Sequence, residues 1–311
     1  MSTSSAALAR SITKRSSMQT YLTTCLLVDQ ELVDDCFRAY AYFRWIDDVV
    51  DITCQTTEER VNFIQHQKEL IERLYKDEKL ENLTPEEVLI SDLISHDRSD
   101  NSRLQSFIQK FIAVIEFDAH RKGKPISQNE LEWYQDCLGK SVTDGIQYFI
   151  GNCCPYPESP FHYRGATAAH ITHMLRDMVH DIEEGYINIP NDYMEENDIG
   201  PGDLYSLPFR AWVQARVELT REYFNEGKLY LDELDVLRCK IAGYWYCARF
   251  EGVLEAIERD GYNLRREYNE RRKLTTWIKM ALLAASLTIK HFDPRKIAIR
   301  RASQNRRSVQ F

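Results

Sequence analysis

The stretch AYFRWIDDVVD, residues 41–51, guides the interpretation of the whole chain, because a run of aromatic and aliphatic residues ends there in three aspartates. At 3.6 residues per turn, Asp47 and Asp51 lie one turn apart on the same face of a helix, and Asp48 lies about 100° around it. Like charges at this spacing repel each other by about 0.2–0.5 kcal/mol, whereas a divalent cation would be attracted by them. The stretch therefore predicts a largely apolar helix with carboxylates at its C-terminal end.

A second stretch repeats this pattern. In HITHMLRDMVHDIEEGYINIP, residues 170–190, Asp177 and Asp181 are again four residues apart on an otherwise apolar helix. Facing helices of a bundle commonly supply ligands to the space between them. Mg²⁺ prefers oxygen ligands and usually binds one or two carboxylates together with water and phosphate oxygens. The two stretches together predict a Mg²⁺ site for a diphosphate, with the ligands Asp47, Asp48, Asp51, Asp177 and Asp181.

An arginine accompanies each acidic stretch. Arg44 precedes Asp47 and Asp48 by three and four residues, and Arg176 adjoins Asp177. Such guanidinium groups could bind phosphate directly. The alternative is a set of surface ion pairs, each contributing a few tenths of a kcal/mol.

The composition favours a single helical domain. The chain has 311 residues, of which 43% are hydrophobic, and only 12 Gly and 9 Pro interrupt it. The net charge of −8 argues against general nucleic-acid binding. We expect an all-α bundle of roughly eight to ten helices, since apolar residues recur at helical spacing. The expected helices cover 30–52, 57–75, 84–97, 102–120, 129–150, 162–184, 208–227, 231–259 and 268–290, with a short one before residue 29.

Both ends of the chain are basic. No acid precedes Asp29, and the last 18 residues, from Pro294, hold six Arg or Lys and no acid. We expect residues 1–16 to be a mobile N-terminal segment, with an organelle transit peptide as the alternative. The tail over 291–311 is either solvated or in peripheral contact with an anionic membrane. No apolar run is long enough to span a bilayer, and the eight Cys include no CxxC, so we expect a cytoplasmic protein with reduced thiols.

Three regions resemble the squalene/phytoene synthase family, whose members join two isoprenoid diphosphates head to head inside an all-α bundle. YAYFRWIDDVVD, from Tyr40, resembles the first aspartate-rich motif of the family, and MLRDMVHDIEEGYINIP, ending at Pro190, resembles the second. YWYCARFEGVLEAIERDGYNL, residues 244–264, resembles the penultimate helix. The resemblance covers residues 17–290 and implies an isoprenoid-synthase-type bundle with a central cavity.

The resemblance also implies roles for individual residues. The five aspartates would hold Mg²⁺, and Arg44 and Arg176 would assist with the diphosphate. Tyr40 matches a tyrosine beside the first motif of the family. Ser16–Tyr21, SSMQTY, is similar to a serine-bearing flap near the diphosphate.

The sequence departs from the family pattern at several positions. His170 and His173 stand where the family usually has Gln and Asn, and GYINIP, residues 185–190, replaces GRxYLP. An arginine and a tyrosine are therefore missing, and Asn188 takes the place of the tyrosine. Phe250 also stands where many relatives have a tyrosine, and LGKSVTDG, residues 138–145, replaces a kink of small residues. These departures concern the steps after the first ionisation.

The histidines around the second motif raise the question of another metal. A diiron bundle needs a carboxylate followed three residues later by His on each of two helices, and Asp177 with His180 is the one such pair in the sequence. We therefore disfavour a diiron site. His173 is interpreted as a substitute for an amide ligand or as a base near pyrophosphate. His170 and His180 are interpreted as structural.

These observations predict an enzyme that ionises an allylic isoprenoid diphosphate and condenses it with a second one. Its catalytic residues would be Asp47, Asp51, Asp177, Asp181 and His173. Family membership would favour farnesyl diphosphate as the substrate. A terpene cyclase, a prenyltransferase onto another acceptor and a non-catalytic binding module remain alternatives, although the five aspartates argue against the last. No GxGxxG nucleotide motif is present, so the sequence does not support use of NADPH.

Overall fold

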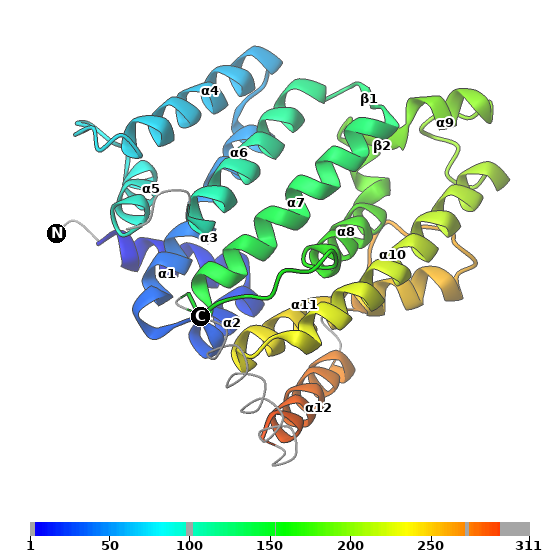
Figure 1. Ribbon diagram of the computed structural model, residues 1–311. Helices are drawn as coiled ribbons and strands as arrows, with labels where there is room; N and C mark the ends of the chain where they lie inside the picture. Colours follow the sequence, from blue (N-terminus) through cyan, green and yellow to red (C-terminus); the bar gives the residue numbers. More distant parts are fainter. Residues whose placement is uncertain (1–3, 98–101, 153, 271–273, 293–311) are drawn as a thin grey trace.

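Helices form nearly all of the regular structure in the computed structural model, which describes residues 4–97, 102–152, 154–270 and 274–292 (Figure 1). The predicted all-α bundle is thereby confirmed. In the first half of the chain the helices are α1 (Ser5–Ser16), α2 (Met18–Leu27), η1 (Gln30–Leu32), α3 (Val33–Asp48), η2 (Val49–Thr53), α4 (Thr57–Leu74), α5 (Pro85–Ser95), α6 (Arg103–Arg121) and α7 (Gln128–Phe149). In the second half they are α8 (Arg164–Glu183), α9 (Asn191–Glu196), α10 (Leu207–Glu233), α11 (Leu237–Arg259) and α12 (Leu274–His291).

Several helices begin where their capping residues dictate. Thr56, Thr84 and Ser127 each accept a hydrogen bond from a backbone N–H of the first turn, and a glutamate three residues on bonds back to the cap. These capping boxes satisfy donors that the first turn leaves free. Helices α4, α5 and α7 accordingly begin within a residue of the predicted positions.

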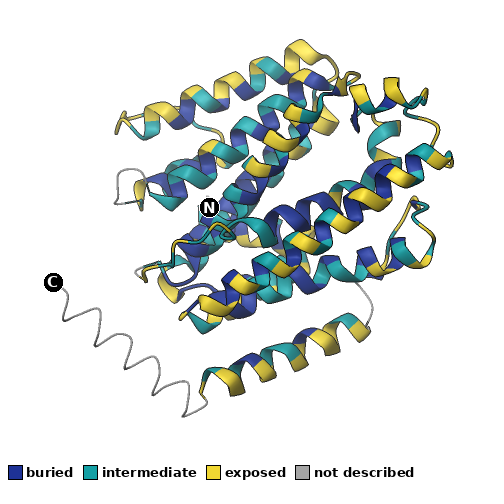
Figure 2. Cartoon of the chain, turned by 45° about the vertical axis from the view of Figure 1, so that its right-hand side comes forward, coloured by how far each residue is buried: buried dark blue, intermediate teal, exposed yellow. Residues whose placement is uncertain are grey.

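Two helices, α3 and α8, occupy the interior of the bundle. Helix α3 packs against α1 and α5, while α8 packs against α7, α10 and α11. Phe37, Tyr42 and Ile46 of α3 are fully buried. Figure 2 shows the buried faces of the helices turned toward one another and the exposed faces turned to solvent. The C-terminal end of α3 and the C-terminal half of α8 carry the two acidic stretches.

The structure differs from the prediction at the N-terminus. Residues 1–16 were expected to be mobile, but Ser5–Ser16 forms α1, which packs on α3 and α5. Ala9 and Thr13 are fully buried there, and Arg10 lies 3.1 Å from Asp34. Small side chains allow this close packing without giving a strong hydrophobic pattern, which explains why the sequence did not reveal it. Of the predicted basic tail, residues 293–311 lie outside the described residues.

Helix α10 is longer than predicted. The expected helix ended at Gly227, whereas α10 continues to Glu233 and α11 begins only at Leu237. A Cβ atom added at Gly227 would lie 2.4 Å from the backbone nitrogen of Gly165. This glycine therefore allows α8 and α10 to approach each other closely and does not end the helix.

A short parallel strand pair joins two connections that are distant in sequence. β1 (Pro125–Ile126) follows α6, and β2 (Ile187–Pro190) follows α8. Gly123 and Gly185, both with positive φ, lie beside it, and Gly123 N donates to Gly185 O at 2.8 Å. The pairing fixes the segment after the second acidic stretch against the end of α6.

No helix within the described ranges combines the length and the hydropathy needed to cross a bilayer.

Candidate active site

The first acidic stretch changes helix type at its end. Asp47 and Asp48 complete α3, and Asp51 lies in the π-helical turn η2, which the sequence did not predict. Such turns in helices occur frequently at functional sites. Arg44 forms ion pairs with Asp48 and with Asp47, the latter at 3.2 Å between Nη1 and Oδ2. This arginine therefore lies beside the first motif, as expected.

In the second stretch, a histidine and an arginine hold Asp177. His173 Nε2 lies 2.9 Å from Asp177 Oδ2, and Arg176 Nε donates to Asp177 Oδ1 at 2.6 Å. Burial alone would raise the pKa of Asp177, but the hydrogen bonds from His173 and Arg176 lower it well below its ordinary value. Asp177 is therefore ionised and already paired.

Two other predicted ligands have a raised pKa, although Arg44 pairs with Asp47 and Asn188 donates to Asp181. Burial, followed by the neighbouring charge of Asp51, raises the pKa of Asp47 to about 6. Burial, followed by the charges of Asp177 and Asp118, raises the pKa of Asp181 to about 7. A nearby cation would favour the ionised form of both carboxylates.

The two acidic stretches face a shared region. Tyr186, in the second stretch, donates its hydroxyl to Asp51 Oδ1 of the first at 3.4 Å. Asp118 of α6 interacts electrostatically with both stretches, because its charge raises the pKa of both Asp47 and Asp181. The structure thus brings together the motifs that the sequence places about 130 residues apart. Asp118 was not predicted, since an acid near the end of a helix is an ordinary surface feature.

A second group that the sequence did not reveal lies near the predicted Tyr40. Burial raises the pKa of Tyr40, and charged neighbours that also affect it include Arg44, Asp47 and Arg249. Burial lowers the pKa of Arg249, and the like charge of Arg176 lowers it further. Among the described residues, the buried Nε of Arg249 and Nη1 of Arg176 have no hydrogen-bond partner. An arginine inside the apolar run YWYCARFEGV was the available signal for this cation.

The histidines differ in environment. His170 is buried, and burial followed by the nearby charge of His173 lowers its pKa to about 3, so it is neutral at physiological pH. His173 is more exposed, with its ring 6.0 Å from Phe250 and its Nε2 beside Asp177. His180 is exposed. His173 therefore contacts an aspartate of the second stretch directly, and His180 interacts electrostatically with Asp181.

The carboxylates fit magnesium through their chemistry, although they do not form a ready-made cluster. Within the part of the chain that the structure describes, no group of three or more His, Cys, Asp or Glu side chains is placed to hold a metal ion. Mg²⁺ usually needs only one or two carboxylates, because water and phosphate oxygens complete its shell. Oxygen donors with raised pKa on two sides of one region suit an ion that arrives together with a diphosphate.

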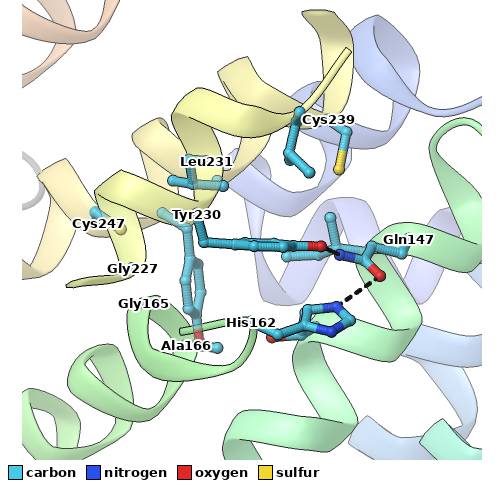
Figure 3. A pocket seen from close by; sticks show the side chains of 14 residues that line it. Gln147, His162, Gly165, Ala166, Gly227, Tyr230, Leu231, Cys239 and Cys247 are labelled. Atoms are coloured by element: carbon cyan, nitrogen blue, oxygen red, sulfur yellow. Dashed lines mark hydrogen bonds between the residues drawn. The ribbon is translucent and has the colours of Figure 1, made fainter. Parts of the chain in front are cut away.

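A small cavity lies among α7, α8, α10 and α11 (Figure 3). Its volume is about 40 Å³, and its lining is mostly apolar. Gln147 Nε2 donates to the Tyr230 hydroxyl at 2.8 Å, and His162 Nε2 lies 2.9 Å from Gln147 Oε1. Ala166 in this lining precedes Asp177 on α8 by a rise of about 16 Å along the axis. The cavity therefore lies toward the opposite end of α8 from the carboxylates, and side chains must move before it can hold a prenyl chain.

Comparisons with known proteins agree with this arrangement. The sequence matches the family model for squalene/phytoene synthase over residues 13–277. The crystal structure of squalene synthase HpnC from Alicyclobacillus acidocaldarius is similar, with a TM-score of 0.66 and 20% identity over 84% of this chain and 95% of that one. A dehydrosqualene synthase in complex with ligand has a TM-score of 0.65 and 14% identity, over 91% and 95% of the two chains. At these identities the structural likeness supports the fold alone, and no curated relative matches the sequence.

Proposed function

We propose a Mg²⁺-dependent condensation of two farnesyl diphosphate molecules for this chain, which belongs to the squalene/phytoene synthase family and is a prenyltransferase-type enzyme. Family membership supports head-to-head isoprenoid condensation in general. The farnesyl chain length, the metal and the roles of individual residues are our proposal.

One observation carries the proposal. Carboxylates from two distant stretches face one region, where Tyr186 of the second stretch contacts Asp51 of the first. Asp47 and Asp181 on the two sides both have a raised pKa. Burying neighbouring carboxylates is unfavourable unless a bound cation offsets their charge. Magnesium ions that arrive with a diphosphate would offset it.

Each group then has a distinct task. The five predicted aspartates would hold Mg²⁺, which when bound supplies positive charge against the diphosphate and its departing pyrophosphate. Arg44, Arg176 and Arg249 bind phosphate oxygens, for which the unpartnered guanidinium atoms of the last two are available. Tyr40 interacts electrostatically with Arg44 and Arg249 and would help to orient them.

The region beside the second stretch suits the allylic cation that remains after ionisation. The ring of Phe250 lies 6.0 Å from His173 and 5.3 Å from Tyr246. Aromatic faces stabilise cations through their quadrupole, and buried apolar surroundings exclude water. His173, held by Asp177, is placed to accept a proton near the pyrophosphate.

The test is incubation of the purified protein with farnesyl or geranylgeranyl diphosphate, with and without Mg²⁺ and NADPH. Pyrophosphate is measured by a coupled assay and the organic product by mass spectrometry. We expect Mg²⁺-dependent pyrophosphate release and a product that contains two farnesyl units. A cyclised product with a single prenyl unit would identify a terpene cyclase, and a lack of pyrophosphate release with either substrate would refute the proposal.

We also propose peripheral contact with an anionic membrane through α12 and the basic segment that follows it. The side chains of Ile278, Leu282 and Ile289 are 51%, 67% and 73% exposed, and they follow a helical spacing along α12. The helix contains two lysines and no acid, and six Arg or Lys follow from Pro294. Apolar and basic groups together favour an anionic lipid surface over a second copy of the same positive surface.

Vesicle sedimentation tests this contact. We expect salt-sensitive binding to vesicles that contain phosphatidylserine, weaker binding to neutral vesicles, and loss of binding after truncation at His291 or in Leu282→Gln. The matched control is Leu229→Gln, since Leu229 is 57% exposed on α10. Equal binding of all variants would contradict the proposal, as would a concentration-dependent dimer that Leu282→Gln dissociates.

A further inference from the structure

Arg121, at the C-terminal end of α6, is a buried cation that the proposed function leaves unused. Its side chain is 7% exposed. Arg121 Nε donates to Asp118 Oδ1 at 2.8 Å, and the second oxygen of Asp118 accepts the Tyr134 hydroxyl at 2.8 Å. A buried guanidinium is costly unless it is paired and hydrogen-bonded. The pairing with Asp118 accounts for its charge, but only part of its hydrogen-bonding capacity is used there.

Part of the remaining capacity is directed at Asn188, while the buried Nη1 of Arg121 has no hydrogen-bond partner among the described residues. Arg121 Nη2 donates to Asn188 Oδ1 at 2.8 Å, and Asn188 Nδ2 donates to Asp181 Oδ2 at 3.1 Å. The guanidinium only donates and the carboxylate only accepts, so these two neighbours fix the orientation of the amide. In the flipped orientation the amide NH₂ would face the guanidinium and its oxygen would face the carboxylate. Arg121 thereby orients a donor toward Asp181.

Arg121 also reaches the first acidic stretch through Tyr186. Its guanidinium carbon lies 5.4 Å from the centroid of the Tyr186 ring, within the range of a cation–π interaction. The hydroxyl of the same ring donates to Asp51 Oδ1 at 3.4 Å. Tyr186 and Asn188 flank Ile187, the first residue of β2, and β2 is paired with β1 just beyond Arg121. One side chain therefore contacts the partners of both acidic stretches.

We propose that Arg121 is a positioning residue that sets Asp51 and Asp181 relative to each other, acting through Tyr186 and Asn188. This inference rests on the proposed function and deepens it, because it assigns a task to the two residues at which GYINIP departs from the family pattern. Arg121 forms no ion pair with either carboxylate within the described chain, although its charge helps to lower the pKa of Asp181. We expect its effect on a magnesium diphosphate to come mainly from holding the partners of both. Removing such supporting contacts around metal ligands typically costs 10- to 100-fold in affinity.

The experiment measures binding of inorganic pyrophosphate in the presence of Mg²⁺ by calorimetry, alongside turnover, for wild type, Arg121→Met, Asn188→Leu and the double variant. We expect each single variant to weaken pyrophosphate binding by about tenfold or more. The double variant should be about as weak as the weaker single variant, because both substitutions break the same chain of contacts. Arg121→Lys should fail to restore binding, since one ammonium cannot reproduce the fork to Asp118 and Asn188.

The control is Arg216→Met. Arg216 is as buried as Arg121, and its Nη2 donates to Gln135 Oε1 at 2.7 Å on another part of the bundle. We expect this variant to lose stability and to keep wild-type pyrophosphate affinity. Tyr186→Phe, which removes one hydroxyl, supplies a second measurement in a fold-preserving variant if Arg121→Met does not fold.

The possible failures are distinguishable. Wild-type affinity in Asn188→Leu and Tyr186→Phe, or losses that add fully in the double variant, would overturn the positioning role and leave the proposed function intact. A wild-type protein that binds no pyrophosphate with Mg²⁺ and releases none from farnesyl diphosphate would overturn the proposed function itself.

Discussion

The two acidic stretches are alike in sequence, but the fold treats their carboxylates differently. Asp177 is held by His173 and Arg176, and its pKa is lowered. Asp181, one turn later on the same helix, has a pKa raised to about 7, and Asp47 on the facing stretch has one raised to about 6. The protein thus lowers the pKa of one carboxylate with its own side chains and raises the pKa of two others, which we propose as magnesium ligands.

This difference in pKa should separate the effects of substitution on activity from the effects on stability. A paired carboxylate contributes to stability, whereas an uncompensated one lowers it and is retained for its chemistry. Substitutions at the two kinds of position should therefore have the same effect on activity and opposite effects on stability.

The largest expected effect is on turnover. Asp181→Asn and Asp177→Asn should each reduce pyrophosphate release by about 10²–10³-fold, because each removes charge that the bound magnesium and diphosphate require. The measurement is the rate of Mg²⁺-dependent pyrophosphate release, with circular dichroism as the check on folding. Asp136→Asn is the control, since Asp136 is exposed on α7, where it pairs with Lys140. Near-normal rates in either active-site variant would remove the basis for treating the two stretches as one site.

The next effect concerns Arg249, a cation that we propose binds the diphosphate. Its buried Nε lacks a partner, and Arg176 is a like charge nearby. Arg249→Met should weaken the binding of pyrophosphate with Mg²⁺ by about tenfold or more, the equivalent of one charged hydrogen bond of about 1.5–3 kcal/mol. Calorimetry measures the loss. The control is Arg221→Met, in which Arg221 of α10 loses its ion pair with Glu258 of α11, the helix that also carries Arg249. Unchanged affinity in Arg249→Met would exclude it from the diphosphate site.

Substitution of the two predicted ligands on α8 should change the free energy of unfolding in opposite directions. At pH 8 and without metal, Asp181→Asn should raise the free energy of unfolding by about 1 kcal/mol, a figure reduced for partial exposure of the side chain. Asp177→Asn should lower it by about 1–3 kcal/mol, because His173 and Arg176 lose their partner. Urea unfolding of both variants measures the difference. A change of the same sign in both would mean that the fold does not distinguish the two carboxylates in this way.

The sequence predicted the helices well because their signals are local. Apolar spacing lies within each predicted segment, and the capping residues Thr56, Thr84 and Ser127, which the structure shows, are equally local. Helix α1 was missed as a packed element, since small residues such as Ala9 give little pattern. Gly227 was taken as the end of a helix, because its close contact with Gly165 comes from another helix and cannot be seen locally.

The same distinction applies to the site. The spacing of the aspartates is a local pattern, and the structure brings the two stretches to one region as expected. The contact between Arg121 and Asn188 spans 67 positions and depends on the pairing of β1 with β2, so no local signal announces it. The π-helical turn that contains Asp51 likewise has no marker in VVDIT. The roles of all these residues remain predictions until the variants are measured.

The last expected effect concerns His170, whose burial contrasts with the exposed His173. The pKa of His170 in the folded protein is about 3, below the ordinary value of 6.5. Between these values the unfolded chain binds a proton that the folded chain does not, so stability falls as the pH drops below about 6.5. Between pH 7.5 and pH 5, His170 should account for a loss of about 2 kcal/mol. Urea unfolding of His170→Gln should show a correspondingly smaller loss over this range, whereas the exposed control His120→Gln should follow wild type. An identical pH dependence in His170→Gln and wild type would show that this histidine is protonated in the fold, and the proposed contrast with His173 would then fail.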